Sequence, residues 1–181
     1  SRDEAVWRDS ALARERTASA PLARMMAFHH MLRGLLGDDR YLTALRRLID
    51  GGKVTPLTIE SYRAALEAAY GEPLDWFFAQ WLRDGALPDY RIVEAQAFLF
   101  ENRETRALRY QTKVVLRNSG TGRMPVPWIL ATEGDPLEGT RWIEANEQVE
   151  LNLETLDRPV AFEVDPDGWI AQRHAPEPGA K

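Results

Sequence analysis

The spacing of apolar side chains predicts that the first half of the chain is helical. Between Gly71 and Pro88, large apolar residues recur three and four positions apart, which places them on one face of a helix. These residues are Leu74, Phe77, Phe78, Trp81 and Leu82. Pro73 suits the first turn of such a helix, and Gly85 suits the left-handed residue that ends it. The stretch therefore predicts a short, capped helix with a buried aromatic face.

The same periodicity predicts further helices before this one. The expected helical ranges are 20–36, 38–50 and 58–70, with the aromatic helix over 73–84 and a polar helix over 3–16. The helix over 20–36 is apolar on most sides, which is typical of a buried helix. Thr58 is expected to cap the helix that follows it. Because the connections are short, we expect neighbouring helices to pack antiparallel, as in a compact bundle.

After Pro88 the apolar positions tend to alternate, which is the period of a half-buried strand. Short apolar runs separated by turn-forming residues predict strands over 91–100, 108–116, 126–131, 140–143, 148–153 and 159–164. Short strands at this spacing favour an antiparallel, immunoglobulin-like β-sandwich. The predicted fold class is therefore α+β, with a helical subdomain over residues 1–88, a β-sandwich domain over 89–172 and a flexible tail over 173–181.

Composition and charge narrow the classes of function. The chain has 181 residues, a net charge of −5 and no cysteine. The negative charge gives no support for binding nucleic acid, which needs a basic surface. The lack of cysteine excludes disulfides and thiolate metal sites, and no apolar run is long enough to predict a membrane-spanning segment. Since the chain begins at Ser1 rather than Met, we expect a processed chain or a piece of a longer protein.

The sequence contains no recognisable catalytic constellation. His29 and His30 are neighbours on a predicted helix, so their side chains point about 100° apart and do not converge on one metal. His174 lies in the tail, and Asp75 is expected to complement the dipole of the helix that it begins. The loop over 165–168 lacks the further ligands of a calcium site. We therefore predict no catalytic, cofactor-binding or metal-binding residue in this chain.

Three segments, taken in order, resemble the aminopeptidase N-like family of zinc metallopeptidases, the gluzincins. They are residues 30–38 (HMLRGLLGD), 58–67 (TIESYRAALE) and 71–82 (GEPLDWFFAQWL), of which the last is the most specific. In that family these helices follow the zinc-binding helix and precede a β-sandwich domain, which the region from Tyr90 to about Ile170 resembles. The resemblance covers roughly residues 22–171. It implies that the chain is the C-terminal, non-zinc-binding part of such a peptidase.

The residues that this family uses for catalysis are missing from the chain. The family's zinc ligands lie in His-Glu-x-x-His and in a later Glu, and its Gly-x-Met-Glu-Asn strand binds the free amine of the substrate. Neither motif occurs here. The family's tyrosine, which stabilises the tetrahedral intermediate, aligns with Leu22, and leucine has no hydroxyl to donate. The resemblance thus implies zinc only in the parent protein, no cofactor in this chain and no catalytic residue to carry over.

Three interpretations of function stay open at this point. In the first, the chain structurally supports a peptidase half that lies upstream in the same polypeptide, and that catalytic domain is its partner, with a peptide substrate possible in the parent. In the second, which the leucine at position 22 favours, the chain is a catalytically inactive scaffold or protein-interaction module. In the third, it is an unrelated helical-plus-sandwich protein. The chain alone is predicted to be inactive, whereas the activity of the parent is left open.

Overall fold

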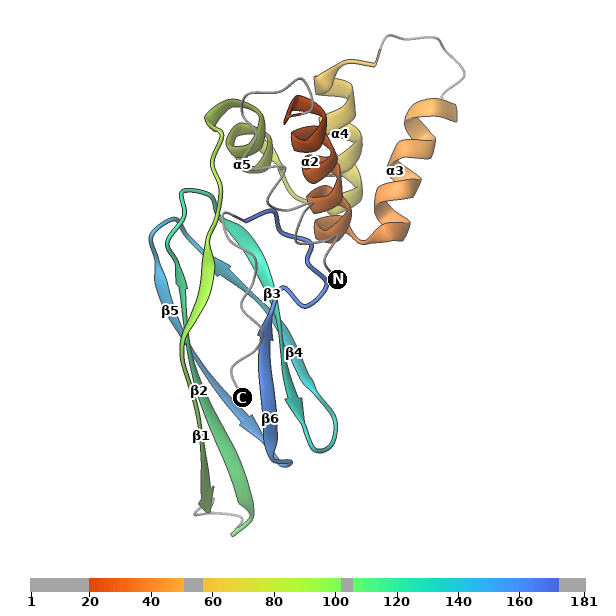
Figure 1. The fold of residues 1–181 in the computed structure, drawn as a ribbon. Coiled ribbons are helices and arrows are strands. Elements are labelled where there is room, and N and C mark those ends of the chain that lie inside the picture. Colours follow the sequence, from red (N-terminus) through yellow and green to blue (C-terminus); the bar gives the residue numbers. More distant parts are fainter. Residues whose placement is uncertain (1–19, 51–56, 102–105, 173–181) are drawn as a thin grey trace. The chain divides into compact units, whose positions relative to one another are not determined.

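The computed structural model describes residues 20–50, 57–101 and 106–172, and the chain divides into two compact units between Gly85 and Ala86. The unit before this boundary contains helices, and the one after it contains antiparallel strands (Figure 1). The described residues therefore have a mixed α+β fold. The polar helix expected over 3–16 and the tail expected over 173–181 lie outside the described residues.

The helices of the first unit follow the predicted ranges closely. They are α2 (Ala20–Leu36), α3 (Asp38–Asp50), α4 (Ile59–Tyr70) and α5 (Asp75–Phe78), which continues as a π-helix, η1 (Ala79–Asp84). The predicted cap of α4 is confirmed, because the Ser61 N–H donates to Thr58 Oγ1 over 3.2 Å. Gly71 ends this helix with φ at 95°, a left-handed conformation that a residue without Cβ adopts without strain.

An aromatic cluster forms the core of the helical unit. The rings of Phe77 and Phe78 lie 5.1 Å and 5.3 Å from the ring of Phe28 on α2, measured between centroids. Trp81 packs 6.1 Å from Phe77, and all four side chains are buried. Such offset and edge-on ring pairs stabilise a core beyond the area that they bury. The predicted aromatic face is therefore confirmed for these positions.

Leu82 departs from the predicted face and is 40% exposed. Regular α-helical spacing from Leu74 onwards predicts a buried Leu82, but the chain is π-helical from Ala79 to Asp84. In a π-helix each hydrogen bond spans one more residue than in an α-helix, so the turn is wider. The wider turn rotates the position eight residues after Leu74 off the buried side, and the prediction for Leu82 is wrong.

Helix α2 is buried on one side only, so the expectation that most of its surface is buried is also wrong. Its buried side carries Ala27, Phe28, Met31, Leu32 and Leu36. Leu22 is 66% exposed, and Met25 and Met26 are exposed as well. Met25 and Met26 lie three and four positions after Leu22, so these residues form an apolar stripe on α2, which we call the α2 stripe.

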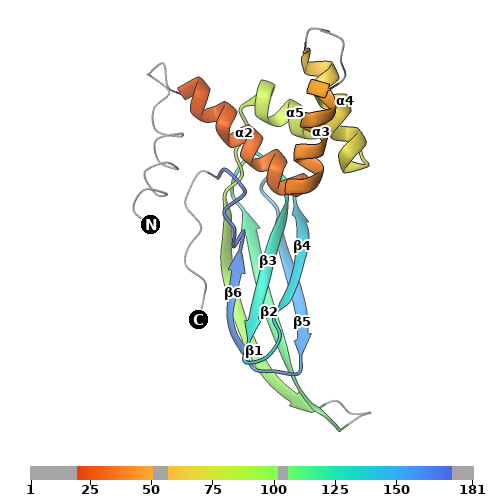
Figure 2. The ribbon, with the colours of Figure 1, turned by 90° about the vertical axis from the view of Figure 1, so that its right-hand side faces the viewer.

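The second unit contains two three-stranded antiparallel sheets, which Figures 1 and 2 show as two layers. One sheet has the order β1-β2-β5 and consists of β1 (Tyr90–Glu101), β2 (Leu108–Asn118) and β5 (Gln148–Thr155). The other has the order β4-β3-β6 and consists of β4 (Leu137–Ile143), β3 (Met124–Thr132) and β6 (Pro159–Val164). Each predicted strand has its counterpart in these sheets.

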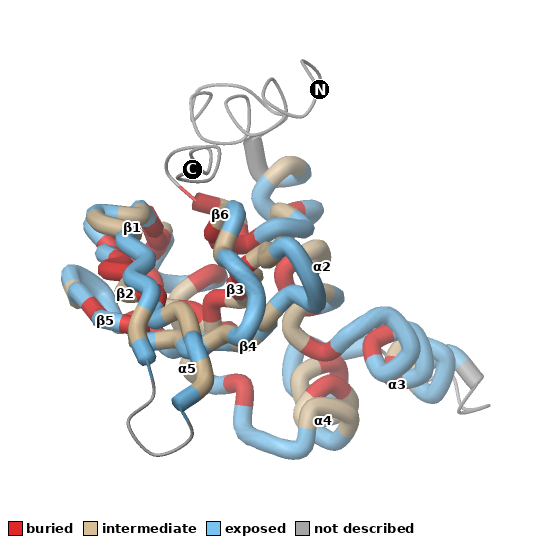
Figure 3. The backbone as a smooth tube through the Cα atoms, turned by 90° about the horizontal axis from the view of Figure 1, so that it is seen from below, coloured by how far each residue is buried: buried red, intermediate tan, exposed pale blue. Residues whose placement is uncertain are grey.

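Each sheet has one buried apolar face. Along β3 every second residue is buried, beginning at Met124, and the buried positions recur along β2 and β3 in Figure 3. In the other sheet, Val114 lies opposite Leu151 and Leu116 lies opposite Val149 across the ladder between β2 and β5. All four of these side chains are buried. Facing apolar pairs of this kind fix the register, because a slip of one residue would turn them towards water.

A glycine makes room for the buried tryptophan of the second sheet. Trp128 on β3 lies directly opposite Gly139 on β4, and a Cβ at position 139 would overlap the indole ring. On its other side the indole stacks on Phe162, with the ring centroids 5.8 Å apart and the planes inclined by 22°. Gly139 thus provides the space that lets Trp128 lie in the core.

Candidate functional site

One histidine and two tyrosines join the three longer helices, and we call them the His29 cluster. His29 comes from α2, Tyr41 from α3 and Tyr62 from α4. Both hydroxyl oxygens lie 2.9 Å from Nδ1 of His29, and they are 3.5 Å from each other. The two tyrosines are buried and the histidine is half-buried. A single ring nitrogen therefore connects three helices through polar contacts.

The protonation states of the His29 cluster follow from its burial. Burial lowers the pKa of His29, because desolvation penalises the imidazolium. Burial, assisted by the hydrogen bond with Tyr41, raises the pKa of Tyr62 above its usual value. At neutral pH the cluster therefore holds a neutral imidazole, whose Nδ1 accepts from the tyrosine hydroxyls when Nε2 carries the proton.

The His29 cluster lacks the order of groups that a hydrolase uses. In a catalytic triad a carboxylate orients the histidine, and the histidine activates a nucleophile. Within the part of the chain that the structure describes, the hydrogen-bond partners of His29 are the two tyrosine hydroxyls. Tyr62, whose pKa is raised by burial, is a weak nucleophile at neutral pH. The cluster is therefore suited to fixing helices together rather than to catalysis.

A pocket of about 350 Å³ opens between α4 and the α5–η1 segment. Its lining is half charged and half apolar, and consists of Ile59, Glu60, Arg63, Asp75, Phe78, Ala79, Leu82 and Arg83. Arg63 forms ion pairs with Asp75 and, at 3.7 Å, with Glu67. Glu67 in turn accepts a hydrogen bond of 2.9 Å from the backbone N–H of Leu74. Asp75 lies in the first turn of α5 as predicted, and its ion pair links α4 to α5.

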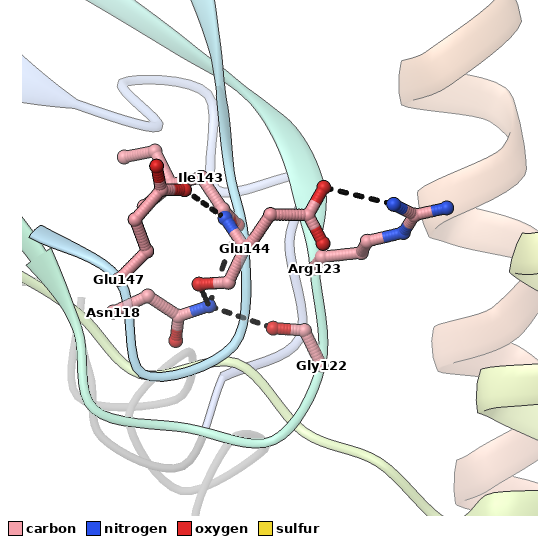
Figure 4. Close-up of polar contacts among 6 residues, drawn as sticks. All are labelled: Asn118, Gly122, Arg123, Ile143, Glu144 and Glu147. Atoms are coloured by element: carbon pink, nitrogen blue, oxygen red, sulfur yellow. Dashed lines mark hydrogen bonds and ion pairs between the residues drawn. The ribbon is translucent and has the colours of Figure 1, made fainter. Parts of the chain in front are cut away.

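In the sheet unit, the fully buried side chain of Asn118 ties several loops together (Figure 4). Its Oδ1 accepts from the backbone N–H groups of Asp89 and Gly120 over 3.0 Å and 2.9 Å. Its Nδ2 donates to the carbonyl oxygens of Gly122 and Glu144 over 2.7 Å and 2.9 Å. An amide whose donors and acceptors are engaged by backbone groups has a structural role and no capacity left for a ligand.

The acidic groups of the sheet unit are also engaged locally. Asp165 Oδ1 and Oδ2 accept from the backbone N–H groups of Trp169 and Ile170 over 2.8 Å and 2.9 Å, so the loop over 165–168 closes on itself. Glu144 pairs with Arg123 at 2.8 Å, and Glu150 pairs with Lys113 at 3.3 Å. These carboxylates have protein partners, so they do not present an open cation site.

Neither unit brings metal ligands together within the described ranges. No group of three or more His, Cys, Asp or Glu side chains that could hold a metal ion occurs in residues 20–50, 57–101 and 106–172. His29 contacts tyrosines, and His174 lies outside the described residues. In the same part of the chain, no helix is both long and apolar enough to cross a membrane.

Comparison with known proteins gives a fold but no family. No family model matches the chain, and no curated protein matches it in sequence. Among solved structures, the chain is similar to aminopeptidase A of Legionella pneumophila, which was crystallised with aspartic acid. The TM-score is 0.56 and the identity is 15%, and the match covers 92% of this chain but 18% of that one. This chain therefore has a peptidase-related fold and spans less than a fifth of the length of that enzyme.

Proposed function

We propose that this chain is the C-terminal, non-zinc-binding part of an aminopeptidase N-like zinc metallopeptidase. The observation that carries the proposal is the similarity in fold, which covers 92% of the chain and a small part of a known aminopeptidase. The order of the three motifs in residues 30–38, 58–67 and 71–82 supports it independently. In this proposal the zinc, the peptide substrate and the catalytic residues belong to an upstream domain of the same polypeptide.

The proposed role of the chain is to support that upstream domain. The α2 stripe exposes Leu22, Met25 and Met26 to water, and adjacent apolar side chains on a surface are typical of an interface. We propose that the upstream domain covers this stripe, which would remove it from water. The His29 cluster and the aromatic core would then hold α2 in a fixed position behind the interface.

Leu22 supports a second candidate function. Leucine stands where the resembled family has a tyrosine that stabilises the tetrahedral intermediate, and its side chain has no donor for an oxyanion. A parent with this substitution would lose that stabilisation. The alternative is therefore a catalytically inactive, peptidase-like scaffold or protein-interaction module with the same fold.

The proposal extends to the architecture of the strand region. We propose that the two sheets pack through their apolar faces as an immunoglobulin-like sandwich over residues 89–172, following a helical subdomain over 1–88. The alternating burial along β3 and the buried pairs between β2 and β5 support this arrangement. Sheets with one apolar face each are stable when those faces cover one another.

The decisive experiment uses the full parent protein and this chain in parallel. The coding sequence upstream of Ser1 would be determined, and both proteins would be assayed for bound zinc by elemental analysis and for hydrolysis of aminoacyl anilides. We expect a His-Glu-x-x-His motif, one zinc per molecule and chelator-sensitive turnover in the parent, and none of these in the chain alone, because it lacks a ligand set for catalytic zinc. A parent protein that has neither the His-Glu-x-x-His motif nor bound zinc would support the alternative, a catalytically inactive scaffold. Zinc-dependent turnover by the chain alone would contradict both proposals.

The interface proposal has its own matched pair of variants in the parent. Met25→Asp places a charge in the α2 stripe, whereas Ile49→Asp places one on α3 at a position that is 81% exposed. Burying an unpaired charge is strongly unfavourable. We therefore expect Met25→Asp to lower the melting temperature of the parent and Ile49→Asp to leave it nearly unchanged. Equal effects of the two substitutions would contradict a covered stripe.

A further inference from the structure

Strand β1 forms an outer edge of its sheet and lacks the usual protection of an edge strand. The sheet order β1-β2-β5 leaves one side of β1 without a strand partner among the described residues. Between Glu94 and Glu101 it carries no charge, proline or glycine. Phe98 and Leu99 in this stretch are 54% and 55% exposed. A long apolar edge with free backbone groups is a template for pairing with another strand.

The other three edge strands differ from β1 in this respect. β5 carries Glu150 and Glu154, and β4 carries Glu138 and Arg141. β6 begins with a proline and carries Glu163. Charges and prolines at edges are the means by which natural sheets avoid pairing with other chains. The lack of such residues in the middle of β1 therefore indicates an edge that is used rather than shielded.

The length of the usable edge is set by an irregularity in β1. The pairing of β1 with β2 shifts register between Ile92 and Glu94, which marks a β-bulge. A bulge bends the strand and interrupts its regular edge. From Glu94 to Glu101 the pairing with β2 is regular, with Glu94 opposite Val115 and Glu101 opposite Leu108. A partner strand could therefore pair with β1 without interruption over residues 94–101.

We propose that two copies of this chain pair through this edge, antiparallel and about a two-fold axis perpendicular to the sheet. Such an axis keeps each residue on the same face in both copies, so even-numbered residues lie opposite even-numbered ones and odd opposite odd. Glu94 and Glu101 consequently never lie opposite each other in any register of this kind. The charges of the edge are thus compatible with a second copy, whereas like charges directly opposite would be destabilising.

The side chains favour an axis at Phe98. In that register Phe98 lies opposite the partner's Phe98, and Ala97 lies opposite the partner's Leu99. Aromatic pairs across strands are stabilising, and a small residue opposite a large one lets the two faces interlock. Phe98 lies next to Gln111 on β2, on the face opposite to that of buried Thr112. The pairing would join two three-stranded sheets into one continuous sheet, and it does not depend on the proposed function.

The lack of cysteine in the chain allows a direct test of the axis. Directly opposed residues in an antiparallel pair have Cα atoms about 4.5–5.5 Å apart, which is within the range that a disulfide spans. Phe98→Cys should therefore give a covalent dimer under mild oxidation. Val160→Cys is the matched control, because Val160 is also 54% exposed and lies on an edge strand, β6, of the other sheet. It should stay monomeric.

Sedimentation of the unmodified chain completes the test. We expect a monomer–dimer equilibrium that shifts with concentration between nanomolar and millimolar protein, is abolished by Phe98→Lys and is retained by Val160→Lys. Circular dichroism of both lysine variants would confirm that they are folded. A monomer throughout this range, a dimer that Phe98→Lys leaves intact, or equal crosslinking through positions 98 and 160 would overturn the proposal.

Discussion

The helical unit and the sheet unit both bury polar groups, but they satisfy them with different chemistry. In the helical unit the shared acceptor is the imidazole of His29, which is titratable and whose pKa burial lowers. In the sheet unit it is the amide of Asn118, which does not titrate and is held by backbone groups. The hydrogen bonds of His29 therefore depend on pH, whereas those of the Asn118 side chain do not.

The two units also distribute their apolar side chains differently. One short segment, Leu74–Trp81, supplies four buried side chains of the helical core, and three of them are aromatic. In the sheet unit the buried residues are spread over alternate positions of several strands, as along β3. A single substitution in the aromatic segment should therefore remove a larger share of the core than one in a strand.

The largest effect is expected for Trp81→Ala. Removing this buried indole should lower the free energy of unfolding by about 3–5 kcal/mol, because it leaves a cavity within the aromatic cluster. Trp81→Phe is the matched control. The indole N–H has no hydrogen-bond acceptor among the described residues, so phenylalanine loses volume but no polar contact. Denaturant unfolding would measure both, and equal losses for the two variants would contradict the packing role.

Asn118→Ala should have the next largest effect and tests the sheet unit. It leaves the N–H groups of Asp89 and Gly120 without their acceptor, and each such buried donor costs about 1–3 kcal/mol. With each of the two donors in the lower half of that range, at about 1–2 kcal/mol, we expect a loss of about 2–4 kcal/mol that is the same at every pH from 5 to 8. Asn152→Ala, at an exposed position on β5, should change little. A loss of stability in Asn118→Ala that changed with pH would contradict the expected difference between the two units.

A smaller effect is expected from pH itself, through His29 in the helical unit. The pKa of His29 is lower in the folded than in the unfolded chain, so the unfolded chain binds more protons as the pH falls below about 6.5. The contribution of His29 is therefore fully present above this pH and is lost as the pH falls through the folded pKa. Hydrogen exchange of α2, α3 and α4 would measure it.

His29→Gln separates titration from hydrogen bonding in that experiment. Glutamine keeps an acceptor for the tyrosine hydroxyls but has no pKa in this range. We expect the acid-induced loss of helix protection to be reduced in His29→Gln and unchanged in His30→Gln. If both variants behaved like the unmodified chain, the pH dependence would originate elsewhere.

The smallest effect is expected at the cap of α4. Thr58→Ala removes the acceptor of the Ser61 N–H and should cost about 1 kcal/mol, a typical value for an exposed N-cap. Thr140→Ala, at an exposed position on β4, serves as the control because its side chain does not cap a helix. Thermal unfolding would detect the difference, and a larger loss at Thr140 would argue against the capping role.

Much of the local structure could be predicted from the sequence because its causes are local. The ranges of α2 and α3 and the cap at Thr58 follow from periodicity and from residues within a few positions. The π-helix over Ala79–Asp84 could not be predicted, because an argument from periodicity assumes regular α-helical spacing. The exposed α2 stripe was also not predicted, since apolar composition alone does not distinguish a buried side of a helix from an exposed one.

The His29 cluster was only partly foreseeable. Helical geometry predicts that His29 and His30 do not share a metal, but it does not predict the partners of His29, which lie 12 and 33 residues away along the chain. Contacts at that separation depend on how whole helices are placed. The same limit applies to the sheets, in which β5 pairs with β2 and β6 pairs with β3. An alternating pattern of apolar and polar residues predicts a strand and its buried face. The pattern does not specify which other strand pairs with that strand.

The glycine beneath Trp128 has a consequence for tracing the evolution of this chain. Because a Cβ at position 139 would overlap the indole, the two positions cannot change independently. In homologous sequences we expect a bulky aromatic at the first position to occur with glycine at the second, and larger residues at 139 only where 128 has become small. Such a coupled pair could be sought among relatives of this chain even where overall sequence identity is low.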